Sequence, residues 1–221
     1  MPVVVVVNPK GVVGKTTVST NIAGYFAARG ARVMLGDVDK QQSSRQWLAD
    51  RPAAAGKIVP WETASAGKVK VPKGVTHVVL DTPAGLDGKE LKGVLKMATK
   101  AVVPLQPSVF DMRATVDFMR ELVEYKKLGR IDIALLAMRV KENTHSLQHL
   151  RDFCEHLPFP LLGVVRDTQN YVHLAAQGLT LFDVPPGRVQ RDLQQWEPIC
   201  RWLDEPSRPQ PSGKVDPDAR Y

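Results

Sequence analysis

The fold is decided by residues 2–17, which read PVVVVVNPKGVVGKTT. Residues 2–7 are apolar and mostly β-branched, and Asn8 and Pro9 end the run, which is typical of a strand buried on both faces of a parallel sheet. A turn with two glycines follows, and apolar residues then recur at helical spacing until Gly30 ends the helix. The segment therefore predicts a strand, a glycine-containing turn and a helix.

The same alternation of strand and helix continues along the rest of the chain. Further strands are expected at 32–36, 77–80, 101–105, 133–137 and 161–165. Helical patterns occupy 42–50, 87–99, 111–128, 144–157, 168–178 and 187–203. This order predicts an α/β fold with three layers, in which helices flank a mainly parallel sheet. The stretch 51–75 is rich in Ala, Gly, Pro and Lys and does not predict a particular element.

Composition indicates one globular domain followed by a tail. The chain has 221 residues, of which 43% are hydrophobic and 24% charged, so a sizeable core can be buried. The last seventeen residues contain four prolines and few apolar side chains, which predicts a disordered tail over 205–221 and a folded domain over 1–204. The longest apolar run is too short to cross a membrane, and the two cysteines form no CxxC pair, so we expect a cytoplasmic protein without a disulfide framework or zinc site.

Basic residues outnumber acidic ones. The chain has 30 Lys and Arg against 23 Asp and Glu, a formal net charge of +7, which favours a polyanionic partner. One basic group falls mostly on one face of the helix predicted at 87–99, and we interpret it as a solvated face. Its members are Lys89, Lys92, Lys96 and Lys100.

The turn at residues 10–17, KGVVGKTT, has the residue types that bind phosphate. Its glycines let backbone N–H groups converge on phosphate oxygens, at the positive end of the helix that follows. Lys15 can reach the β and γ phosphates, and the Thr16 hydroxyl can ligate Mg²⁺. The turn therefore predicts a site for ATP or ADP with Mg²⁺.

This turn resembles the deviant Walker A motif KGGxGKTT of the ParA/MinD ATPases, with Val12 in place of a glycine. The resemblance implies a P-loop NTPase fold and slow, partner-stimulated ATP hydrolysis. It implies that Lys10 reaches across a nucleotide-sandwich dimer to the partner's phosphates, and it assigns catalysis to Lys10, Lys15 and Asp39. Nucleotide contacts are implied for Gly11, Val12, Val13, Gly14, Lys15, Thr16 and Thr17.

Later segments resemble the same family in the same order. Residues 37–41, DVDKQ, are similar to the DxDPQ switch, which implies that Asp39 positions the attacking water; a carboxylate cap for the helix at 42–50 is the alternative role. Residues 78–85 resemble the Walker B segment, which implies that Asp81 holds Mg²⁺ through water, with Asp37 behind it.

Other expected contacts rest on the resemblance alone. Pro107 belongs to the segment 103–108, which is similar to a strand and turn near the nucleotide. Met138, which precedes Arg139, stands where family members often place an Asn that contacts adenine. A late R..Y..A..G segment borders the base and the dimer face and comprises Arg166, Tyr171, Ala175 and Gly178. Nonspecific DNA binding is implied for Arg139, Lys141, Arg166, Arg188 and Arg191.

The predicted function is an ATP-dependent dimerisation and DNA-binding switch that positions a plasmid, chromosome region or protein cargo. Its expected partners are a second copy when ATP is bound, nonspecific DNA of the nucleoid, and a ParB-like or other adaptor. A MinD-like membrane-cycling ATPase is an alternative, but it needs a carboxyl-terminal amphipathic helix that the prolines of 205–221 would break, so no stable membrane binding is expected. A P-loop metabolic ligase is disfavoured by Lys10 and by the Asp37 and Asp39 pair.

Val12 bears on the last alternative, a nucleotide-binding module that does not hydrolyse ATP. A stiff, branched side chain at this point should crowd the facing loop of the dimer, weakening dimerisation and hydrolysis together. The milder interpretation is a loop that accommodates Val at negative φ.

Overall fold

The computed structural model describes residues 1–37, 42–61, 63–64, 68–69, 71–86, 88–108, 115–127 and 131–207. Its main sheet has seven strands: β1 (Val3–Val6), β2 (Val33–Asp37), β3 (Ile58–Pro60), β6 (His77–Asp81), β7 (Lys100–Leu105), β8 (Asp132–Val140) and β9 (Leu161–Arg166). They lie in the order β3-β2-β6-β1-β7-β8-β9, and every neighbouring pair is parallel. A separate antiparallel pair consists of β4 (Thr63–Ala64) and β5 (Lys68–Val69).

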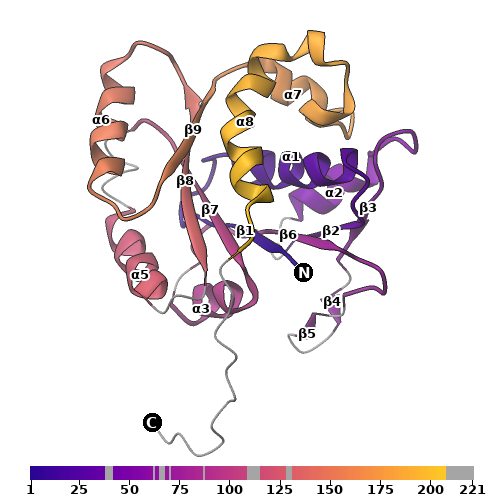
Figure 1. The fold of residues 1–221 in the computed structure, drawn as a ribbon, viewed down its shortest axis with the longest axis horizontal. Helices are drawn as coiled ribbons and strands as arrows, with labels where there is room; N and C mark the ends of the chain where they lie inside the picture. The colour runs from indigo at the N-terminus through magenta and orange to yellow at the C-terminus, as the bar shows by residue number, and fades with distance from the viewer. Residues whose placement is uncertain are drawn as a thin grey trace, which may run out of the picture.

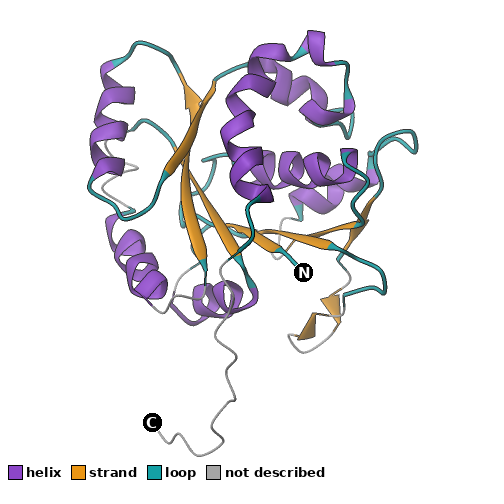
Figure 2. Cartoon of the chain, viewed as in Figure 1, coloured by secondary structure: helices purple, strands orange, loops and turns teal. Residues whose placement is uncertain are grey.

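Helices cover both faces of the sheet (Figures 1 and 2). One face carries α3 (Gly88–Met97), α5 (Val116–Lys127) and α6 (His145–Glu155). The other carries α1 (Lys15–Ala28), α2 (Ser43–Ala49), α7 (Gln169–Ala175) and α8 (Gln190–Asp204), together with the short 3-10 turns η1 (Leu181–Asp183) and η2 (Pro186–Arg188). The predicted three-layer α/β fold is therefore confirmed.

Strand β1 shows why the sheet has a core on each side. Val5 packs in the core beneath α3, α5 and α6, whereas Val4 and Val6 pack in the core beneath α1 and α8. Successive side chains of a strand point to opposite faces, so an uninterrupted valine run suits a strand covered on both sides. All three valines are fully buried.

The six predicted strands are present as β1, β2, β6, β7, β8 and β9, but β3 and the short pair of β4 and β5 were not predicted. β3 is three residues long, ends at Pro60 and lies in the stretch 51–75, for which the sequence predicts no particular element. The predicted helices correspond to the observed ones, although residue 87 of the helix predicted at 87–99 and residues 111–114 and 128 of the helix predicted at 111–128 lie outside the described residues. No helix in the described ranges has the length and apolar character needed to span a membrane.

The interpretation of Lys100 as part of a solvated helix face is wrong. Lys100 begins β7 and is only 2% exposed, and its ammonium donates hydrogen bonds to the backbone carbonyls of Trp202, Leu203 and Glu205. These carbonyls end α8, where the helix dipole is negative. Burial is the main influence on the Lys100 pKa and lowers it. Helix α8 ends at Asp204, and residues 208–221 of the predicted tail lie outside the described residues.

A buried ion pair joins the connection between α2 and β3 to the carboxyl-terminal half of the chain. Arg51 contacts Asp183 through two hydrogen bonds of 2.9 and 2.7 Å, and the two side chains are 4% and 3% exposed. Arg51 also donates to the carbonyls of Gly56 and Gly178, and Asp183 accepts from the backbone N–H of Thr180. Both charges are therefore fully partnered, the condition under which a buried pair is tolerated.

Arg51→Met is expected to lower the free energy of unfolding by about 3–5 kcal/mol, because it leaves the Asp183 carboxylate buried without its partner. Urea unfolding measures the change. Arg120→Met is the matched control: its pair with Asp117 is exposed, so the loss should stay below about 1 kcal/mol. Equal losses in the two variants would contradict the proposed importance of burial.

Candidate phosphate-binding site

The loop of residues 8–14 lies at the carboxyl end of β1. At β1 the direction in which the chain adds strands to the sheet reverses: β2, β3 and β6 lie on one side of β1, and β7, β8 and β9 lie on the other. Ligands of open α/β sheets bind at such reversals. Helix α1 begins directly after the loop, at Lys15, so its amino end faces this edge of the sheet.

Hydrogen bonds tie the loop to neighbouring strands along its length. The Asn8 side chain donates to the carbonyl of Pro104 at 2.8 Å and accepts from the N–H of Lys10 at 2.8 Å. Gly85, in the turn after β6, donates its N–H to the carbonyl of Pro9 at 2.7 Å. The loop is thus held from both sides by the segments that end β6 and β7.

Two loop residues have left-handed backbone conformations. Gly14 has φ 94, and a Cβ there would lie 3.1 Å from the terminal methyl of Met138. Val12 has φ 51, and 83% of the residue is exposed. The expectation that the loop tolerates Val12 at negative φ is therefore wrong. A β-branched residue in this region is rare and costs about 1–3 kcal/mol.

Lys15 and Thr16 occupy the first turn of α1. The Lys15 ammonium donates a 2.6 Å hydrogen bond to the carbonyl of Lys10, and the Lys15 residue is buried. The Lys15 side chain therefore folds back onto the loop and bonds to its backbone. Of the other loop residues, Val13 is buried, Gly11 is exposed and Thr17 is half-buried.

The Asp81 carboxylate ends β6 and is 2% exposed. It accepts hydrogen bonds from the Thr16 hydroxyl at 2.8 Å and the Ser19 hydroxyl at 3.1 Å. Burial raises the pKa of Asp81 to about 6, and the negative charge of Asp37, its register partner on β2, adds to the increase. The hydrogen bonds and the charge of Lys15 oppose it.

Asp37 holds the start of α2. One of its carboxylate oxygens accepts from the N–H of Ser44 at 2.9 Å, the hydroxyl of Ser44 at 2.8 Å and the N–H of Arg45 at 3.2 Å. The capping role that the sequence suggested for Asp39 is thus taken by Asp37. Asp39 itself lies outside the described residues.

These donors suit a magnesium ion. Mg²⁺ prefers oxygen ligands, and Thr16, Asp81 and the adjacent Asp37 present hydroxyl and carboxylate oxygens. A buried carboxylate with a raised pKa is also a group whose charged form a cation would stabilise. The described part of the chain contains no group of three or more His, Cys, Asp or Glu that could hold a metal.

The three residues expected near the base, Pro107, Met138 and Arg139, differ in how deeply they are buried. Pro107 follows β7 and is half-buried, whereas Met138 is buried and fills the space beside Gly14. Arg139 is exposed and has φ 52, at an irregularity in the pairing of β8 with β9.

Two of the five basic residues expected at a DNA surface are paired with carboxylates of this chain. Arg166 contacts Asp192 at 2.6 and 3.1 Å, and Asp192 is fully buried. Arg191 contacts Glu142 at 2.5 Å. Arg139, Lys141 and Arg188 are exposed.

Sequence analysis did not find Ser19, and it placed Gln106 near the nucleotide only through the resemblance of the segment 103–108. Ser19 follows Thr16 by three residues, so their shared face on α1 was a signal that could have been used. Gln106 follows β7, and its side-chain amide donates to the carbonyl of Val12 at 2.9 Å. The sequence gives no signal for this particular contact, because 94 residues separate the two groups.

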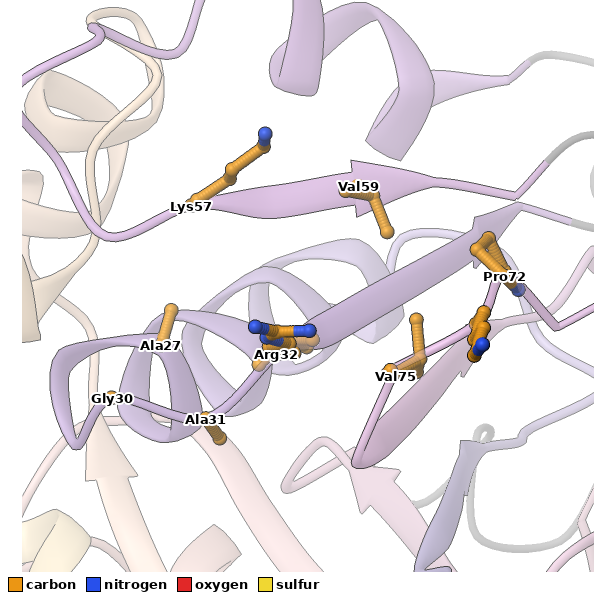
Figure 3. Close-up of a pocket in the computed structure, with 11 residues that line it drawn as sticks. Ala27, Gly30, Ala31, Arg32, Lys57, Val59, Pro72 and Val75 are labelled. Atoms are coloured by element: carbon orange, nitrogen blue, oxygen red, sulfur yellow. The ribbon is translucent and has the colours of Figure 1, made fainter.

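A separate pocket of about 510 Å³ lies at the amino ends of β2, β3 and β6, away from the phosphate-binding loop (Figure 3). Ala31, Val59 and Val75 contribute apolar surface, and Arg32 and Lys57 contribute basic side chains. The candidate site is therefore assigned to the phosphate-binding loop and not to this pocket.

Comparisons with known proteins identify the family of this chain. Residues 4–181 match the family model for the CobQ/CobB/MinD/ParA nucleotide binding domain. The maintenance of carboxysome distribution protein A of Gloeobacter kilaueensis is 36% identical over 123 residues, which cover 55% of this chain and 56% of that protein. The chain thus spans about half the length of this relative.

Solved structures share the fold. The MinD cell division protein of Aquifex aeolicus has a TM-score of 0.70 at 17% identity, covering 96% of this chain and 100% of that one. A cobyrinic acid a,c-diamide synthase from Mycobacterium smegmatis, with a bound ATP analogue and magnesium, has a TM-score of 0.64 at 19% identity, covering 96% and 100%.

In the nucleotide-free protein, Asp81→Asn should raise the free energy of unfolding more at pH 7.5 than at pH 4.5. Because the pKa of Asp81 is raised to about 6, the folded state binds its proton more tightly than the unfolded state, and the parent chain loses stability as pH rises towards 6. The two gains should differ by about 2 kcal/mol in urea unfolding. Asp117→Asn, at an exposed site, is the control; a gain independent of pH would contradict the prediction.

Proposed function

Because the chain belongs to the CobQ/CobB/MinD/ParA nucleotide-binding family, we propose that it is an ATP-driven switch of the ParA type. ATP or ADP binds at residues 10–17, and the nucleotide controls dimerisation and DNA binding. The observation that carries the proposal is the closed arrangement of Lys15 on the loop, with Thr16 bonded to Asp81 beside it.

Each element of the loop has a defined role in holding phosphate. The Lys15 ammonium exchanges the Lys10 carbonyl for phosphate oxygens, which bear more negative charge. The backbone N–H groups of the loop and the amino end of α1 stabilise the same oxygens. When bound, Mg²⁺ neutralises phosphate charge, and Thr16 and Asp81 would hold it, with Asp37 behind them.

Hydrolysis is proposed to be slow and to depend on dimer formation. Lys10 acts across the dimer on the partner's nucleotide, and Asp39 orients the attacking water. Family membership and the match of residues 10–17 and 37–41 support these roles.

The dimer is proposed to bind DNA without sequence preference and to position a cargo. A net charge of +7 supports a polyanionic partner, and the exposed Arg139, Lys141 and Arg188 are better placed to bind phosphate than the ion-paired Arg166 and Arg191. The carboxysome-distribution relative favours a protein assembly as cargo, reached through a ParB-like or other adaptor that stimulates hydrolysis. The protein would then be cytoplasmic and nucleoid-associated.

Lys15→Ala should abolish MgATP binding in calorimetry, because a lost charged phosphate contact costs about 1.5–3 kcal/mol or more. Asp39→Ala is the contrasting variant: binding should persist while turnover is lost, since a carboxylate that orients water acts mainly in the transition state. Because Val12 is expected to impair hydrolysis, turnover with and without Asp39→Ala is compared in the Val12→Gly background. Unchanged affinity in Lys15→Ala would refute the assignment of the loop.

Val12→Gly should strengthen ATP-dependent dimerisation by about 5- to 150-fold, because overpacking at an interface costs about 1–3 kcal/mol. Light scattering with ATP and with ADP measures the dimer. DNA affinity should rise in parallel and fall steeply with added salt, as counterion release requires. Robust ATP-dependent dimers of the parent chain would show that Val12 does not obstruct the interface.

A further inference from the structure

The tip of the phosphate-binding loop is held by a side chain from another strand. The Gln106 amide donates to the carbonyl of Val12 at 2.9 Å. Val12 is 83% exposed, so packing of its own side chain contributes little to holding its left-handed conformation. A bond to its carbonyl therefore acts directly on a strained residue.

Gln106 is well placed to act as a fixed anchor. It directly follows β7, and the carbonyl of Pro104 in that strand accepts from the side chain of Asn8 at the base of the loop. The carbonyl of Gln106 accepts from the N–H of Ser108 at 2.8 Å, which closes a tight turn. The same strand end thus contacts the loop at its base and at its tip.

The bond also fixes the peptide group between Val12 and Val13. The described peptide bonds are trans, so the carbonyl of Val12 and the N–H of Val13 point in opposite directions. The bond from Gln106 keeps the Val12 carbonyl oxygen hydrogen-bonded and directs the Val13 N–H away from Gln106. An anion-binding loop needs its N–H groups, and not its carbonyls, presented to the ligand.

We propose that Gln106 is a positioning residue of the phosphate-binding loop, which holds the Val12–Val13 peptide in the orientation that binds nucleotide phosphates. The inference rests on the proposed nucleotide binding and adds a residue to it. Because Gly adopts positive φ without steric cost, a loop with Gly at position 12 needs this anchor less. The effects of changing residues 106 and 12 are therefore coupled.

The test is a double-mutant cycle read by titration of a fluorescent ADP analogue, which requires no dimer. Gln106→Ala should raise the Kd about fivefold in the parent chain, the value of one hydrogen bond, and by less than about twofold in the Val12→Gly background. Gln106→Glu, of the same size but unable to donate when ionised, should weaken binding at least as much as Ala. Gln148→Ala, on the surface of α6, is the matched control and should leave the Kd unchanged.

The outcomes separate the inference from the proposed function. Equal fold-changes in the two backgrounds, or a Gln106→Ala variant with lower stability in urea but unchanged Kd, would overturn the inference alone. A parent chain that binds no ADP would overturn the proposed function and the inference with it. Weakened binding that Val12→Gly rescues supports both, because a general loss of stability would not be rescued at one loop position.

Discussion

The buried carboxylate of Asp81 joins the central sheet to the first helix. It ends β6, lies in register with Val6 on β1 and Asp37 on β2, and accepts hydrogen bonds from Thr16 and Ser19 on α1. The start of α1, and with it the loop, is thereby fixed relative to three strands. Burial of this carboxylate opposes its ionisation, as its raised pKa indicates, so the site is arranged for a cation more than for the stability of the empty fold.

Much of the fold could be predicted because its signals are local. Buried β-branched runs, helical spacing and their alternation in the chain imply a parallel sheet with helices on both faces, and family membership agrees with the motif at residues 10–17. Strand β3 could not be predicted, since a three-residue strand ending in Pro60 has no measurable period. Lys100 misled for another reason: a charged residue is normally exposed, and the carbonyls that bury it belong to the other end of the chain.

The candidate site was predictable where its residues are contiguous. Gly11 to Thr17 lie together because the chain itself places them there, whereas Ser19 and Gln106 join the site through contacts that only the folded sheet creates. The conformation of Val12 was also hidden, because its residue type argues against the positive φ that the loop imposes. Arg166 illustrates the opposite case. A basic side chain predicts a surface that binds polyanions, yet Arg166 forms an ion pair with the buried carboxylate of Asp192.

The position of Lys100 has a chemical consequence. Its amine is occupied by three carbonyls and lies over the ring of Trp202, 4.6 Å from the ring centre, out of reach of reagents that acylate exposed lysines such as Lys89 or Lys92. Acylation would remove the charge that holds the last carbonyls of α8 and would need room that the folded chain does not offer. A modified Lys100 and a docked end of α8 are thus mutually exclusive, which makes this lysine an internal marker of whether the last helix is in place.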